Sequence, residues 1–216
     1  MDPTGRFAEL VAGPDDALAL DEAVLLVAAH DHAVDVAAQR ARLDALARGC
    51  AATLEGVLER LFAEEGFAGA ENDYHHPDHS FLDRVLDTRR GLPILLSIVV
   101  TEVAARAGVC VAPVAMPGHF LLRDCVDTDV FIDPFHGGCL LDRDECVAIF
   151  RAIHPGAPFR EDFLAPVDHR LVLLRVLTNL VATYRVRGPF ESVAWATKLR
   201  SLVTGGDARL EVAGLN

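Results

Sequence analysis

One stretch of the sequence limits the possible folds more than any other. From Ile94 to Val100 the side chains are apolar on almost every side of a helix, with only Ser97 interrupting them. A helix that is apolar all round has to be buried. Pro93 stands at the favoured first position of this helix, and Gly108 is a typical glycine stop. The sequence therefore predicts a buried central helix that the rest of the chain must cover.

The residue pattern changes from helical to extended directly after this helix. Three segments rich in apolar and β-branched residues follow one another, at Val109–Ala115, His119–Arg123 and Val130–Asp133. No crossover helix separates them, so the strands should pair in antiparallel fashion. This order predicts an α+β fold and excludes a doubly wound α/β fold.

Helical spacing of apolar residues dominates the remainder of the chain. Helices are predicted at 21–29, 36–47 and 54–62 before the sheet, and at 142–153, 168–185 and 190–203 after it. The last two should form an antiparallel hairpin with Trp195 in its seam, and 210–212 could add a short strand. We expect three consecutive parts: a helical N-terminal subdomain at 1–65, a core at 66–165 and a helical tail at 166–216.

The segment from Gly66 to His79 is rich in turn-forming and polar residues and is predicted to be a long loop. Ser80 and Asp83 have the spacing of a capping pair for the helix that follows. The loop contains three histidines and one aspartate between His75 and His79, but their spacing matches no zinc signature. A loop site completed by His119 or His136 across the fold has no support in the sequence. We therefore expect no metal ion and no cofactor.

Charge and composition limit the possible partners and compartments. The formal net charge is −12, from 20 Lys and Arg against 32 Asp and Glu, which disfavours nucleic-acid binding. No apolar run approaches the roughly 20 residues of a membrane span, and no signal-peptide pattern is visible. Five cysteines without a CxxC pair indicate reduced thiols and a cytoplasmic protein.

Two of the predicted strands carry a histidine and an aspartate where they can meet. If these strands form a hairpin with its turn centred on Val126, His119 lies directly opposite Asp133. An aspartate beside a histidine fixes the ring tautomer and stabilises the imidazolium, so His119 is a candidate base and Asp133 its orienting group. The alternative is that both polar residues only end their strands.

A helix followed by a strand with His and a strand with Asp resembles the transglutaminase-like (papain-like) core, in which the helix begins with a catalytic cysteine. Counting back from Gly108 places that position near Pro93 or Ile94, where the chain has no thiol. Ser97 is the nearest hydroxyl, about one turn further into the helix. A serine inside a helix more often bonds to its own backbone than acts as a nucleophile.

The resemblance becomes more specific in several short motifs. The chain resembles the SirB family, bacterial proteins with a transglutaminase-like domain and a tetratricopeptide-like tail; a related region occurs in certain F-box proteins. The resemblance extends from about Asp21 to Val203, and its motifs include 66–69, 89–94, 106–108, 117–121, 132–135 and, in the tail, Arg170, Arg175 and Asn179-Leu180. It departs from the family at His79, where the family usually has asparagine.

The resemblance implies a scaffold of cysteine enzymes that keeps His119 and Asp133 without the usual cysteine. The favoured interpretation is a non-catalytic module that binds a protein or peptide, with Tyr74, Arg90, Pro93, Pro117 and Gly118 in the binding surface. The alternative is an active hydrolase or acyltransferase in which His119 is the base and Asp133 its orienting group. The nucleophile would then be Ser97, a displaced cysteine such as Cys139, or an activated water. The sequence does not determine the oligomeric state.

Overall fold

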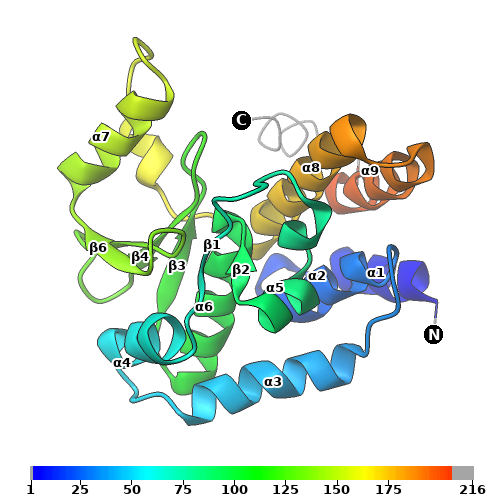
Figure 1. The fold of residues 1–216 in the computed structure, drawn as a ribbon, viewed down its shortest axis with the longest axis horizontal. Coiled ribbons are helices and arrows are strands. Elements are labelled where there is room, and N and C mark those ends of the chain that lie inside the picture. The colour runs from blue at the N-terminus through cyan, green and yellow to red at the C-terminus, as the bar shows by residue number, and fades with distance from the viewer. Residues whose placement is uncertain (1, 206–216) are drawn as a thin grey trace. The chain divides into compact units, whose positions relative to one another are not determined.

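A computed structural model of the chain describes residues 2–205, so the strand expected at 210–212 lies outside the described residues. The helices are α1 (Pro3–Ala12), α2 (Leu20–Ala28), α3 (Val36–Arg48), α4 (Leu54–Leu58), α5 (Leu82–Thr88), α6 (Pro93–Ala107), α7 (Arg143–Ile153), α8 (His169–Arg187) and α9 (Phe190–Thr204) (Figure 1). The strands are β1 (Ala68–Gly69), β2 (Arg90–Gly91), β3 (Val111–Val114), β4 (Leu121–Asp124), β5 (Phe131–Asp133) and β6 (Cys139–Leu141).

Contacts divide the chain into two units, and each is discontinuous in sequence. The helical unit comprises Met1–Arg42, Ala70–Arg90 and Asp168–Asn216, and the sheet unit comprises Leu43–Gly69 and Gly91–Val167. The division into three consecutive parts at 1–65, 66–165 and 166–216 stays a prediction. The α+β fold with an antiparallel sheet and C-terminal helices is confirmed. Within the described residues, no helix combines the length and apolar character needed to cross a bilayer.

The sheet unit is built around α6, the predicted buried helix. Pro93 occupies its first turn, and Gly108 ends it with a φ of 79°, a left-handed conformation that glycine adopts without strain. Most of its side chains are buried, and it packs against α4, β3 and β4. The all-round apolar sequence is explained by neighbours on several sides of the helix.

The four main strands lie in the sheet in the order β3-β4-β5-β6, and every neighbouring pair is antiparallel. Leu122 pairs with Ile132 and Arg123 with Phe131, so the β4–β5 turn is centred on Asp127. The register predicted from a turn at Val126 is therefore wrong by two positions along β5. Because side chains alternate with a period of two, a shift of two positions keeps the same residues on each face.

The helical unit contains the predicted C-terminal hairpin, in which α8 and α9 lie side by side (Figure 1). Trp195 of α9 meets Tyr184 of α8 with ring centroids 5.7 Å apart, which confirms its place in the seam. Helix α1 packs against α2 and α9. The sequence analysis missed α1, although Asp2 caps it and Pro3 opens it.

Two local predictions in the sequence are wrong. Phe81, not Ser80, is the N-cap of α5, and its apolar side chain can make no capping bond. The Asp83 carboxylate bonds to His32 Nε2 at 2.7 Å instead of to the start of the helix. Cys110 and Cys125 form a disulfide, contrary to the expectation of five reduced thiols. The pairing of β3 with β4 brings the Cα atoms of the two cysteines to 5.5 Å from each other, a distance typical of disulfides.

Candidate functional site

The turn before β4 positions His119. Gly118 has a φ of 78°, and a Cβ there would lie 2.6 Å from Ile153 and 2.8 Å from His154 Nε2. The same His154 nitrogen lies 3.2 Å from the carbonyl oxygen of Pro117, to which it can donate a hydrogen bond. The backbone N–H of His119 donates to the carbonyl of Met116 at 3.0 Å. Only glycine fits this turn, so Pro117 and Gly118 serve to orient His119.

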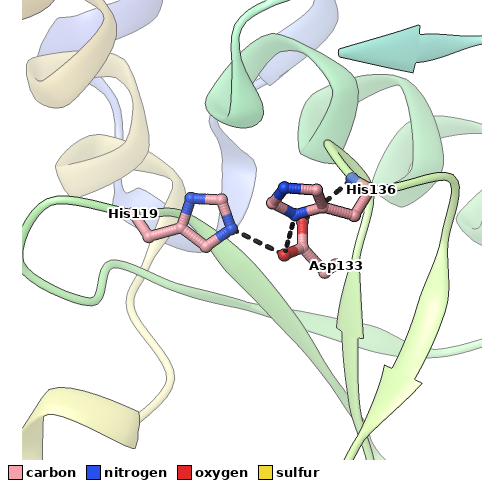
Figure 2. Close-up of side chains that lie close together, drawn as sticks. All are labelled: His119, Asp133 and His136. Carbon is pink, nitrogen blue, oxygen red and sulfur yellow. Dashed lines mark hydrogen bonds and ion pairs between the residues drawn. The ribbon is translucent and has the colours of Figure 1, made fainter. Parts of the chain in front are cut away.

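Asp133 ends β5 and is completely buried. Its Oδ1 accepts the backbone N–H groups of Phe135 at 3.0 Å and His136 at 3.3 Å. Its Oδ2 accepts a bond from His119 Nε2 and another from His136 Nδ1, each at 2.8 Å (Figure 2). Both carboxylate oxygens are thus fully engaged, and the carboxylate has one fixed orientation.

The environment of Asp133 favours its charged form. Burial acts to raise the pKa of this carboxyl, but the hydrogen bonds and charges of His119 and His136 outweigh burial and hold the pKa below its ordinary value. A carboxylate that stays ionised can orient both imidazole rings. The sequence analysis did not assign His136 to this site; the signal was its position three residues after Asp133, across a turn through Pro134.

The bond to Asp133 also determines the tautomer of His119. When the ring is neutral, its Nε2 carries the proton that is donated to Asp133, and its Nδ1 carries the lone pair. Within residues 2–205, Nδ1 of His119 makes no hydrogen bond. His119 is almost buried, whereas the His136 side chain is 57% exposed. His119 therefore has the arrangement of an oriented base. A base of this kind acts in catalysis only together with a neighbouring nucleophile.

The start of α6, where the resemblance places a nucleophile, is apolar. Leu92, Pro93 and Ile94 are all buried, and none has a group that could attack a carbonyl. Ser97 is also buried, and its Oγ has no hydrogen-bond partner within the described residues, neither His119 nor the backbone of its own helix. Its role as a nucleophile stays a prediction.

None of the three free cysteines has the environment of an activated thiol. Cys139 pairs with Asp133 across the β5–β6 ladder, and burial together with the Asp133 charge raises its pKa. Burial raises the pKa of Cys146 to about 12 and also raises that of Cys50. Catalytic thiols have lowered pKa values, because the thiolate is the nucleophile.

Two of the residues predicted for a binding surface belong to the helical unit. Tyr74 is 40% exposed and contacts the His75 ring edge to face, at 5.3 Å between centroids. Arg90 is exposed, and its Nη1 donates to the backbone carbonyl of Arg89 at 2.9 Å. Pro93, Pro117 and Gly118 lie in the sheet unit. The structure thus places the five residues in both units, and their role in binding stays a prediction.

Comparisons with known proteins match the architecture described above. Residues 28–178 match the transglutaminase-like superfamily. A UPF0162 protein of Xylella fastidiosa is 35% identical over 169 residues, which are 75% of this chain and 60% of that protein. UPF0162 protein PA3419 of Pseudomonas aeruginosa is 30% identical over 227 residues, covering 100% of this chain and 83% of its own length.

A more distant similarity is found to F-box only protein 21 of Mus musculus, which is 28% identical over 144 residues. These residues are 62% of this chain but 22% of the mouse protein. The chain spans 60% of the length of the Xylella relative. No solved structure matches the chain significantly.

Proposed function

The chain belongs to the transglutaminase-like superfamily and groups with the UPF0162 proteins, and we propose that it has lost thiol catalysis and binds a peptide segment of a partner protein. Within the superfamily we assign it to the SirB type, on the motifs at 117–121 and 132–135 and on the helical hairpin of α8 and α9. The expected cytoplasmic location was based on reduced thiols, and the Cys110–Cys125 disulfide removes that support, so no compartment is part of this proposal.

The observation that carries the proposal is the apolar start of α6. An oriented imidazole accelerates acyl transfer only when it can take a proton from a nucleophile within hydrogen-bond reach. Pro93 and Ile94 supply no such group, and Ser97 Oγ makes no hydrogen bond to His119. His119 and Asp133 then form a retained, buried polar pair, and the function is recognition.

The edge of the sheet offers a place for a peptide beside this pair. Strand β6 is the last strand of the four-stranded sheet, and within the described residues only β5 pairs with it. Leu140 in β6 is 50% exposed, and Asp133 pairs with Cys139 of the same strand. An extended peptide can add to such an edge through backbone hydrogen bonds, with side-chain contacts giving specificity.

Loss of catalysis is tested with small acyl substrates. We expect the purified chain to hydrolyse p-nitrophenyl acetate, and to transfer the acyl group of a glutamine-containing dipeptide to hydroxylamine, no faster than its His119→Ala variant does. A wild-type rate at least tenfold above that of the variant contradicts the proposal. If alkylation of the free thiols then abolished the excess rate, the nucleophile would be a cysteine; if it did not, Ser97 would become the next residue to replace.

Peptide binding is tested by panning a library of displayed random peptides. We expect wild-type protein to enrich a sequence motif and the Leu140→Lys variant, which places a charge on the β6 edge, to lose that enrichment. The matched control is Val126→Lys, because Val126 is an exposed apolar residue of the same unit, in the β4–β5 turn. Equal enrichment by wild type and Leu140→Lys would contradict binding at this edge.

A further inference from the structure

Three side chains of the sheet unit present potential metal ligands to one another. Nε2 of His119, Oδ2 of Asp133 and Nδ1 of His136 all lie within 4.8 Å of one another, the one such group of His, Cys, Asp or Glu side chains in the part of the chain that the structure describes. We propose that His119, Asp133 and His136 bind a zinc ion. The sequence analysis considered His119 and His136 only as residues completing a site at the loop 75–79, and not as ligands together with Asp133.

The distances suit a zinc ion after a small adjustment. Zinc binds imidazole nitrogen and carboxylate oxygen at about 2.0 to 2.2 Å, so neighbouring ligand atoms of a tetrahedral site lie about 3.4 Å apart. In the structure, Oδ2 lies 2.8 Å from each of the two nitrogens. A widening by about half an ångström would admit the ion. His136, whose side chain is 57% exposed, can supply the widening on its own side of Oδ2, and on the other side the nearly buried His119 ring has to shift by the same amount.

The groups behind the ligands hold the carboxylate in a geometry that suits a metal. Oδ1 of Asp133 is occupied by the two backbone N–H groups of Phe135 and His136, which leaves Oδ2 as a single-oxygen ligand. Such bonds from a second layer of groups orient metal ligands and support their affinity. Asp133 itself is fixed at the end of a sheet strand rather than on a loop.

The types of ligand atom favour zinc over other metal ions, and the exposure of His136 leaves one coordination position open to water. Two imidazole nitrogens with one carboxylate oxygen suit zinc better than magnesium or calcium, which prefer oxygen ligands. The ion would need both ligating nitrogens without protons, so His119 would carry its proton on Nδ1 and His136 on Nε2. With His136 57% exposed, the ion could enter from solvent and keep water as a fourth ligand.

The test measures zinc binding directly and needs no activity. Purified chain, stripped with a chelator, is titrated with Zn²⁺ in competition with a chromophoric chelator. We expect one zinc per chain. We expect His136→Ala to weaken zinc binding by about 100-fold or more, a larger loss than is typical for a residue that only hydrogen-bonds to a metal ligand. His136→Ala removes an exposed side chain, so the metal-free variant should melt as a folded protein.

The matched control is the double variant His75→Ala/His76→Ala, which removes two exposed loop histidines and should bind zinc as wild type does. The proposal is overturned if wild type binds no zinc at micromolar concentration, or if the loop variant loses binding while His136→Ala keeps it. The zinc site and peptide binding can be tested separately, because panning in the presence of a chelator measures the peptide interaction without zinc.

Discussion

Each of the two units contains a buried aspartate bonded to a histidine, and the two pairs differ in what surrounds them. In the sheet unit, His119 Nε2 lies 2.8 Å from Asp133 Oδ2; in the helical unit, His32 Nε2 lies 2.7 Å from Asp83 Oδ2. Distance and burial therefore do not distinguish a site from a structural pair. What distinguishes the two pairs is the partner of the second ring nitrogen of each histidine.

Both nitrogens of His32 face carboxylates. Its Nδ1 lies 3.2 Å from Asp31 Oδ2 and its Nε2 lies 2.7 Å from Asp83 Oδ2, so each ring nitrogen has a carboxylate partner. The other oxygen of Asp31 accepts the Tyr184 hydroxyl at 2.5 Å. These four side chains join α5, α8 and the turn after α2 within the helical unit. His32 therefore holds elements of the helical unit together, and neither of its ring nitrogens is left for another group.

His119 has a carboxylate on one side only, and its second nitrogen stays available. The aspartates also differ: both oxygens of Asp133 are bonded, whereas Oδ1 of Asp83 is buried without a partner in the described residues. The comparison teaches that a histidine–aspartate pair indicates a functional site only when the second ring nitrogen is free for another group.

The largest effect is expected for Asp133→Ala. The change leaves two imidazoles and two backbone N–H groups without their acceptor, so we expect a loss of about 3 to 5 kcal/mol of unfolding free energy. Urea denaturation measures it, with Asp127→Ala in the exposed β4–β5 turn as the control. Equal stability of the two variants would mean that the Asp133 network contributes nothing to the fold.

His32→Ala should cost less, about 2 to 3 kcal/mol, because it leaves Asp83 buried with neither oxygen bonded. The same denaturation measures the loss, and His75→Ala, an exposed histidine of the same unit, is the control. His32→Ala should leave zinc and peptide binding by the sheet unit unchanged. A loss of either would break the distinction between a structural pair and a functional one.

Tyr184→Phe is expected to have the smallest effect, about 1 to 2 kcal/mol at neutral pH, since one bond to a carboxylate is lost. Burial and the bond to Asp31 both raise the pKa of Tyr184, so folding favours the neutral phenol. That stabilisation is complete below the unfolded pKa of about 10 and is lost as the pH rises further. Unfolding free energies from pH 8 to 11 should fall more steeply for wild type than for the variant; parallel curves would contradict this assignment.

Local signals in the sequence predicted several elements correctly. The helix predicted at 142–153 is present as α7, where the structure shows a capping box of Asp142 and Glu145, and α6 ends at Gly108 as predicted. The prediction for Asp83 failed although its spacing from Ser80 was right, because a partner 51 positions away in the sequence competes for its carboxylate. Capping patterns describe what a side chain can do locally, and a buried charge takes the strongest partner within reach.

The sequence by itself determined the buried helix, the order of strands that makes the sheet antiparallel, and the pairing of the His119 and Asp133 side chains, although His119 lies in the turn before β4 and not in the strand. Each of these depends on periodicity and neighbouring residues. The tertiary structure decided the strand register, the Cys110–Cys125 disulfide, the entry of His136 into the site and the lack of a hydrogen bond between Ser97 and His119. These depend on contacts between residues far apart or across a turn, whose geometry packing alone fixes.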